Sequence, residues 1–131
     1  MISTRDFLKK QNYSEKTIDG GIERLLKKWE GLFIKVHSKN MMNDIDFFEY
    51  LNELDGRRII KEILENCFVD EGIREKIKQF DRNFKKVTFE ISHHISGKHL
   101  DLKYDKNKFW WYYRVPNAKK EIWKLYYASS L

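Results

Sequence analysis

Few residues of this chain could do chemistry, and three of them are histidines that lie close together in the sequence. His93, His94 and His99 could collect a metal, because neutral imidazole is a good ligand for zinc, nickel or copper. Glu90 and His93 form one Glu-x-x-His pair, but a di-iron bundle needs a second pair on another helix and the sequence has none. Adjacent histidines on a helix also point in different directions. We therefore expect no metal site.

The sequence lacks the motifs of the common enzyme classes. It has no glycine-rich phosphate loop, no Gly-x-Ser-x-Gly elbow and no His-Glu-x-x-His zinc signature. The single cysteine, Cys67, cannot form an intramolecular disulfide, and its apolar neighbours Phe68 and Val69 predict a small buried side chain rather than a nucleophile. We expect a protein that is not an enzyme and that carries no cofactor.

The most distinctive chemical feature is an aromatic run at 109–113, which basic residues surround and Pro116 ends. We interpret the run as a strand that packs on the core, and the side chains of a strand alternate between its two faces. One set is expected to face inward: Phe109, Trp111 and Tyr113. The other set is expected to form an exposed partner-binding site with two neighbouring lysines: Lys108, Trp110, Tyr112, Arg114 and Lys119. An aromatic and arginine cluster is the usual energetic centre of a protein interface.

Two functional classes follow from this run and from the net charge of +6. The first is a non-catalytic protein-binding module, such as a small inhibitor, an immunity-type protein or an adaptor. The alternative is an RNA or single-stranded nucleic-acid binder, in which the rings stack on bases and the lysines hold phosphates. The charge is segregated, with nine acids against three basic residues at 41–72 and fourteen basic residues against six acids at 73–131. This segregation is compatible with both classes, and we favour a protein partner.

The length and composition predict a single domain over residues 1–131. No apolar run approaches the roughly 18 residues of a membrane span, and the first residues lack the basic-then-apolar pattern of a signal peptide. We expect a cytoplasmic protein that does not associate with membranes. The sequence does not predict an oligomeric state.

Two long apolar stripes of helical period predict the main helices. One runs through a helix at 70–95: Ile73, Ile77, Phe80, Phe84, Val87, Ile91 and Ile95. The other runs through a helix at 15–36, its expected packing partner: Ile18, Ile22, Leu25, Trp29, Leu32 and Val36. Ser3 and Ser14 are expected to cap a short helix at 4–10 and the helix at 15–36. Gly20, Gly21 and Gly31 indicate either a bend or a close helix approach in that second helix.

The other elements are predicted from local signals. Asn43 is expected to cap a helix at 44–54, and Asp55-Gly56 to separate it from a second helix at 57–66, which together form a helical hairpin. The acid-rich surroundings argue against a DNA-reading helix-turn-helix there. A β-hairpin is expected at 99–104 and 109–115, and 86–92 alternates well enough to add a strand, although we favour helix there. Asn117 is expected to cap a last helix. The predicted fold class is mainly α: a small bundle of five or six helices with a short C-terminal β-hairpin.

Three strings resemble a family of small uncharacterised bacterial helical proteins. They are Gly-Gly-Ile-Glu-Arg-Leu-Leu-Lys-Lys-Trp-Glu at 20–30, Tyr-Leu-Asn-Glu-Leu-Asp-Gly-Arg-Arg at 50–58 and Trp-Trp-Tyr-Tyr-Arg-Val-Pro at 110–116. The resemblance covers most of the chain. It implies a compact helical domain and transfers no catalytic residue.

Overall fold

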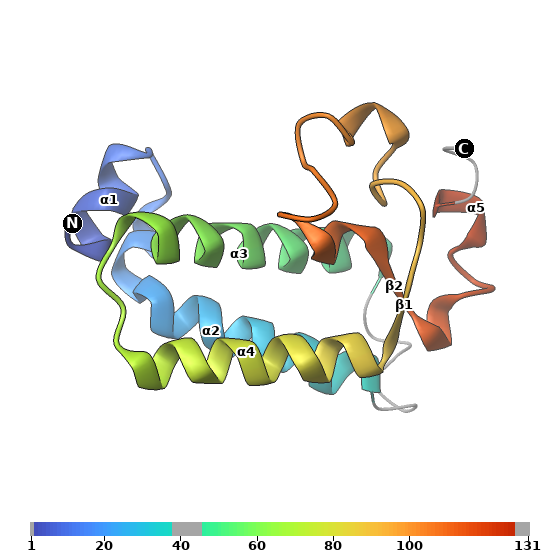
Figure 1. Cartoon of the computed structure of the whole chain (residues 1–131), viewed down its shortest axis with the longest axis horizontal. Coiled ribbons are helices and arrows are strands. Elements are labelled where there is room, and N and C mark those ends of the chain that lie inside the picture. The colour runs from blue at the N-terminus through green and yellow to red at the C-terminus, as the bar shows by residue number, and fades with distance from the viewer. Residues whose placement is uncertain (1, 38–45, 128–131) are drawn as a thin grey trace.

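The structure is a computed structural model that describes residues 2–37 and 46–127. Three long helices dominate it: α2 (Glu15–His37), α3 (Phe47–Asn66) and α4 (Glu71–Lys86). The short helix α1 (Thr4–Lys10) lies at one end of α3, and α2 contacts both α3 and α4 (Figure 1). The predicted mainly α fold is confirmed. Within the described residues, no helix is both long and apolar enough to cross a membrane.

Side chains just ahead of the helices satisfy amide groups of the first turn, which have no partner within the helix. The Ser3 Oγ accepts from the Asp6 amide at 3.1 Å, and the Ser14 Oγ accepts from the Thr17 amide at 3.3 Å, as predicted. The predicted cap Asn43 and the helix start at 44 lie outside the described residues. Asp46 caps α3 instead, accepting from the amide of Glu49 at 2.8 Å.

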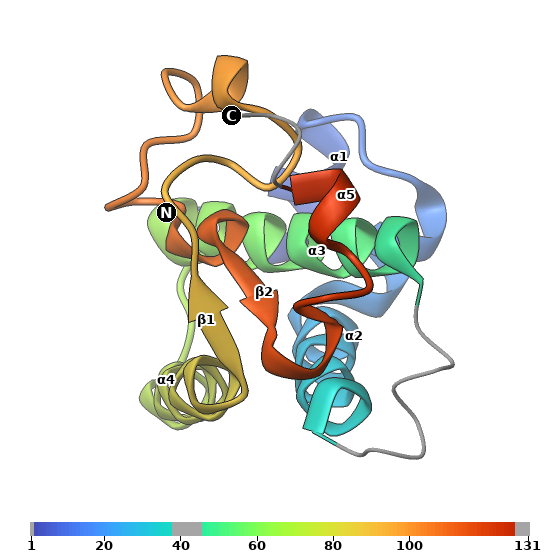
Figure 2. The same cartoon turned by 90° about the vertical axis from the view of Figure 1, so that its right-hand side faces the viewer.

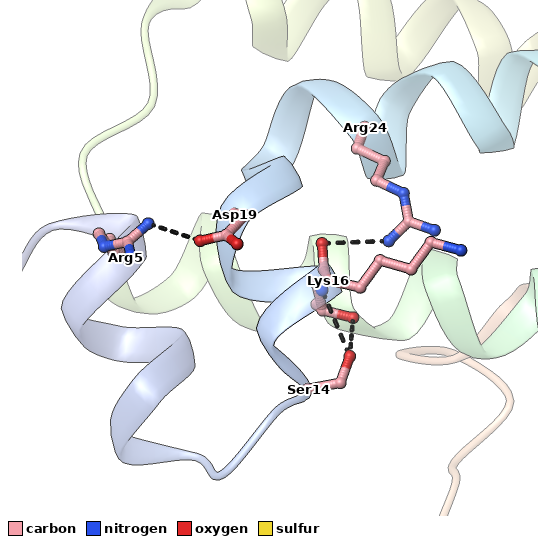
Figure 3. A network of polar contacts seen from close by, with 6 residues as sticks. Arg5, Ser14, Lys16, Asp19 and Arg24 are labelled. Atoms are coloured by element: carbon pink, nitrogen blue, oxygen red, sulfur yellow. Dashed lines mark hydrogen bonds and ion pairs between the residues drawn. The ribbon is translucent and has the colours of Figure 1, made fainter.

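The glycine pair in α2 produces a bend, one of the two outcomes that the sequence left open. Gly21 has a φ of 61°, which L side chains rarely adopt, and the helix is kinked there. A Cβ on Gly20 would lie 2.4 Å from the Arg24 side chain, which crosses the kink and donates to the Lys16 carbonyl at 3.2 Å (Figure 3). Gly20 therefore leaves room for the arginine that satisfies a carbonyl at the bend.

Helix α3 is continuous, so the predicted hairpin with a turn at Asp55-Gly56 is wrong. One face stays buried across the glycine, through Tyr50, Leu54, Arg57, Ile60 and Ile63. A glycine inside a helix costs only about 1 kcal/mol relative to alanine. Burying five side chains along one face outweighs that cost, since packing supplies most of the stability of a helix in a protein.

Helix α4 ends at Lys86, and the prediction of helix from there to 95 is wrong. Strand β1 (Thr88–Glu90) follows and pairs antiparallel with β2 (Arg114–Pro116), with Phe89 opposite Val115 (Figure 2). The guanidinium of Arg114 fixes this arrangement: it donates to the carbonyl of Lys85 at 3.2 Å and to the carbonyl of Thr88 at 2.9 Å. An arginine from β2 thus satisfies a carbonyl at the helix end and holds the strand beside it.

The strands of the predicted hairpin are replaced by 3₁₀ turns at 99–104 and 109–113. Residues 99–104 form no strand, because Lys98–Leu100 is a 3₁₀ turn. Trp110–Tyr113 is a second 3₁₀ turn, η3, which leads directly into β2. The last predicted helix is reduced to a 3₁₀ turn at Asn117–Lys119 and a short helix α5 (Lys124–Tyr127). Pro116, and not the predicted Asn117, is the cap residue of this turn.

The helices and the C-terminal segment share one core. The rings of Trp29 in α2 and Phe84 in α4 lie 4.7 Å apart, so the predicted packing of the two apolar stripes is confirmed. Cys67 is fully buried, as expected, and its backbone forms an isolated parallel bridge with Ile2. The largest fully buried side chains of the described residues come from α1 to α4, the segment after β1, η3 and β2: Leu8, Leu32, Tyr50, Leu54, Ile60, Ile63, Phe84, Ile95, Trp111, Tyr113 and Val115.

Candidate functional site

The aromatic run does not present the alternating faces that the sequence predicted. Because η3 is a tight helical turn, Trp111, Tyr112 and Tyr113 are all buried. Tyr112 is 3% exposed and Lys119 is 5% exposed, so these two residues do not belong to an open surface. The prediction that these residues share one exposed face with Trp110 and Arg114 is therefore wrong.

The other predicted site residues are dispersed. Arg114 is half-buried and engaged at the end of α4. Trp110 is half-buried, with the Lys85 Nζ 4.4 Å from the centre of its ring. Lys108 is exposed. Most of the residues that were predicted to bind a partner thus make contacts that stabilise the fold.

The buried tyrosines attach the segment 91–109 to the bundle. The amides of Ile91 and Ile95 donate to the carbonyls of Tyr113 and Tyr112, both at 2.8 Å. The Tyr113 hydroxyl donates to the carbonyl of Tyr104 at 2.6 Å. We call this segment the 91–109 loop; it extends above α3 in Figure 1.

A cavity of about 410 Å³ lies between this loop and α3, and we call it the α3 pocket. One helical face supplies its floor, since the α3 residues recur every three or four positions: Phe48, Leu51, Asn52, Asp55 and Arg58. The loop and η3 supply the remaining lining: His94, Ser96, Leu100, Lys103, Tyr104 and Tyr112. Its size lies within the range of small-molecule sites.

His94 has a defined tautomer in the wall of this pocket. The Ser96 amide donates to the His94 Nδ1 at 3.0 Å, so the proton of the neutral ring lies on Nε2. Burial lowers the pKa of His94 to about 4, against the opposing effect of Asp101 and Asp55. The ring stacks on Tyr112 at 4.5 Å between centroids. His94 is therefore neutral at pH 7, and its buried Nε2 has no hydrogen-bond partner among the described residues.

Two polar side chains of α3 that line the pocket form hydrogen bonds with tyrosine hydroxyls. The Tyr112 hydroxyl donates to the Asp55 Oδ1 at 2.6 Å, and burial together with this bond raises the pKa of Tyr112. The Arg58 Nη1 donates to the Tyr104 hydroxyl at 3.0 Å. Lys103 is exposed at the edge of the pocket, with its Nζ 5.4 Å from the Tyr104 ring centre.

The three histidines do not converge. His93 and His94 lie in the loop rather than on a helix, and the His93 Nδ1 lies 2.8 Å from the backbone oxygen of His94. The His99 ring packs against Gly97, where a Cβ would lie 2.6 Å from it. Within residues 2–37 and 46–127, no group of three His, Cys, Asp or Glu side chains is placed to hold a metal ion.

An exposed apolar surface lies next to the pocket, where α5 packs beside the start of α3 (Figure 2). The Tyr126 ring stacks on Phe47 at 4.6 Å and lies 6.4 Å from Phe48, which is 66% exposed and also lines the pocket. Ile122 and Leu125 are exposed close by in the chain. We call these four side chains the α3–α5 surface: Phe48, Ile122, Leu125 and Tyr126.

Comparison with known proteins gives no guide to this site, since no family model, curated protein or solved structure matches the chain. The resemblance noted in the three strings therefore stays a prediction. Sequence reasoning missed the α3 pocket because it placed a turn at Asp55-Gly56. An unbroken helix would have aligned Asn52, Asp55 and Arg58 near one face, and that spacing was the available signal.

Proposed function

We propose that the protein is a non-catalytic protein-binding module that contacts its partner through the α3–α5 surface. The supporting observation is that exposed hydrophobic side chains occur at the start of α3 and at 122–126, two stretches that contact each other through the Tyr126 ring. Half of the large hydrophobic side chains that are exposed in the described part of the chain belong to the α3–α5 surface. An exposed apolar cluster is a common mark of a protein interface.

The composition of the surface fits this role. Phe48 and Tyr126 are aromatic, and aromatic rings are enriched among the residues that dominate binding energy. Leu125 is 83% exposed, so a partner that covers it removes apolar area from water without disturbing the core. Exposed charges stand next to this apolar centre in sequence, including Glu49, Glu121 and Lys124, as at the rim of many interfaces.

The nucleic-acid alternative has less support. Three rings of the aromatic run lie inside the core, so they are not available to stack on unpaired bases. The basic residues alone would give binding that depends on phosphate charge and weakens steeply with salt.

A matched pair of variants tests the proposal. Phe48 and Phe68 are both exposed phenylalanines, but Phe48 lies in the first turn of the 20-residue helix α3 and Phe68 follows its C-cap Cys67. The helix between them is about 30 Å long. The tagged protein and its Phe48→Ser and Phe68→Ser variants are used to capture partners from the source cells after nuclease treatment. We expect a stoichiometric protein partner that the wild type and Phe68→Ser retain and that Phe48→Ser binds at least about tenfold more weakly.

Leu125→Ser provides a second variant of this surface that does not line the pocket, and it should weaken the same partner. Equal capture by all variants would place the interface elsewhere. A complex that disappears after nuclease treatment would favour the nucleic-acid alternative. Concentration-dependent self-association, measured by analytical ultracentrifugation and lost in Phe48→Ser, would identify a second copy of the chain as the partner.

A further inference from the structure

The side chains that line the α3 pocket carry more positive than negative charge. Arg58 and Lys103 contribute two positive charges and Asp55 contributes one negative charge, while His94 is neutral at pH 7. The side chains that line the pocket therefore carry one excess positive charge, and the carboxylate of Asp101 lies behind the wall, where it accepts from the His94 amide at 2.7 Å. A bound monoanion would meet the two cations of the lining, whereas a bound cation would face them.

The hydrogen-bonding groups are also unequal. The Tyr104 hydroxyl accepts from Arg58, so its own proton remains to be donated. Lys103 is a donor without acceptor capacity, and it is exposed where it can reach a ligand. The carboxylate of Asp55 already accepts the hydroxyl proton of Tyr112. Arg58, Lys103 and Tyr104 thus form a side of the pocket that offers donors to an acceptor-rich ligand, while Asp55 and Asn52 keep acceptor capacity nearby.

The remaining lining is apolar. Phe48 and Leu51 from α3 and Leu100 from the loop face the same cavity as the charged groups. A site with apolar walls and a few donors at one side is typical of pockets for small organic molecules. Inorganic ions would leave those walls in contact with water.

We propose that the α3 pocket binds a small organic monocarboxylate, with its carboxylate against Lys103, Arg58 and Tyr104 and its apolar body against Phe48, Leu51 and Leu100. Arginine and lysine are the side chains that form charge-assisted bonds with carboxylates. A volume of about 410 Å³ accommodates a single-ring acid. This ligand site is separate from the protein-binding role, although Phe48 belongs to both.

Benzoate and benzamide form the first test, because they share a ring and differ in charge. Titration calorimetry at pH 7 should give saturable one-to-one binding of benzoate and at least about tenfold weaker binding of benzamide. Acetate, which lacks the ring, should also bind more weakly than benzoate. Equal binding of benzamide, or no saturable binding of benzoate at millimolar concentration, would overturn the proposal. Tighter binding of inorganic phosphate than of benzoate would also overturn it, in favour of a phosphate site.

Matched lysine variants locate the binding. Lys98 and Lys103 are exposed on the same loop, but only Lys103 is among the residues that line the pocket. Lys103→Gln should weaken benzoate binding by about threefold to tenfold, and Lys98→Gln should leave it unchanged. Arg58→Gln should weaken it further, and its thermal melting curve shows whether the variant is folded. Equal effects of Lys98→Gln and Lys103→Gln would contradict a site in this pocket.

Leu125→Ser separates the two proposals. This substitution alters the α3–α5 surface without touching the pocket, so it should leave benzoate binding unchanged. Conversely, Lys103→Gln should leave capture of the protein partner unchanged. Either proposal can then fail while the other stands.

Discussion

Arg57 and Arg58 are adjacent in α3, but their side chains lie in two different polar environments. The Arg57 Nε and Nη2 donate to the two carboxylate oxygens of Asp81 in α4 at 3.0 and 2.9 Å. The Trp29 ring nitrogen donates to the same carboxylate at 2.9 Å, and the Arg57 guanidinium lies 4.5 Å from the centre of the Trp111 ring. Arg58 instead faces the α3 pocket and bonds one tyrosine hydroxyl there.

The difference lies in burial and in whether the arginine has a carboxylate as its partner. We call Arg57, Asp81, Trp29 and Trp111 the Arg57 cluster; it joins α2, α3, α4 and η3 inside the core. Its charges form a buried bidentate pair, which fixes geometry more than it adds net stability. The α3 pocket leaves Lys103 exposed, and its lining has two cationic side chains and one anionic side chain. The Arg57 Nη1 and the Trp111 Nε1 have no hydrogen-bond partner among the described residues, so the cluster differs from the pocket in its paired charges and not in full hydrogen bonding. A charge pair inside the core holds helices in place, whereas charges that reach the surface can bind a ligand.

Breaking the Arg57 cluster should have the largest effect on stability. Asp81→Ala leaves Arg57 buried without its counter-charge, so the free energy of unfolding should fall by about 3 to 5 kcal/mol. Glu75→Ala is the matched control, since its ion pair with Lys78 on the same helix is exposed and should contribute at most about 1 kcal/mol. Urea denaturation of both variants measures the difference. Similar losses in the two variants would show that the buried pair is not special.

The apolar side of α4 gives the next effect. Ile77 is fully buried, whereas Phe80 is only partly buried at the edge of the core. Ile77→Ala should cost about 2 to 5 kcal/mol because it leaves a cavity in a packed region. Phe80→Ala should cost less despite removing more atoms, since water can enter its site. A larger loss for Phe80→Ala in the same denaturation experiment would contradict the arrangement of these two side chains.

Acid should weaken the wall of the α3 pocket through His94. Its pKa is about 4 in the folded protein and 6.5 without the protein environment, so the unfolded chain binds the proton more tightly. The stability contributed by neutral His94 is therefore fully present above pH 6.5 and is lost as the pH falls towards 4. The loss amounts to at most about 3 kcal/mol, because solvent screens part of the effect. Denaturation midpoints measured across this range should show it.

His94→Asn isolates that contribution from the carboxylates that titrate in the same range. The asparagine oxygen can accept from the Ser96 amide as Nδ1 does, but the side chain has no proton to gain. The variant should show a shallower decline in stability between pH 6.5 and 4 than the wild type. Parallel curves would mean that His94 does not titrate as its burial requires.

The smallest expected effect concerns the bond between Tyr112 and Asp55. Tyr112→Phe keeps the buried ring and removes the hydroxyl that donates to Asp55 at 2.6 Å. The free energy of unfolding should fall by about 0.5 to 1.5 kcal/mol, since Asp55 is half-buried and water can replace the lost donor. A loss as large as that of Asp81→Ala would show that the two regions depend equally on their polar contacts, and the comparison would fail.

The sequence was sufficient for features that depend on local chemistry and period. Ser3 and Ser14 cap their helices as predicted, and the apolar stripes of α2 and α4 pack on each other through Trp29 and Phe84. These signals act within a few residues or along one helical face. They do not require knowledge of what lies across the core.

The errors arise where distant contacts override local signals. The Asp55-Gly56 pair is typical of a turn, but buried residues on both sides of it keep α3 continuous. Ile91 and Ile95 continue the stripe of α4, yet their amides bond Tyr113 and Tyr112 from a segment about twenty residues later. The α3 pocket was missed for the same reason, because its lining joins Asp55 to His94 and Tyr112.

The way the 91–109 loop is attached has a consequence for local unfolding. Strands β1 and β2 pair over three residues each, and together with η3 they close the loop against α3. A segment held by few contacts can detach at a lower free energy than global unfolding requires. If the pairing of β1 with β2 were lost, the 91–109 loop, which forms one wall of the pocket, would move away from α3 while the helices stay packed. Any ligand that bridges loop and helix would therefore oppose this opening, and the rate of amide exchange at Ile91 and Ile95 would report its occupancy.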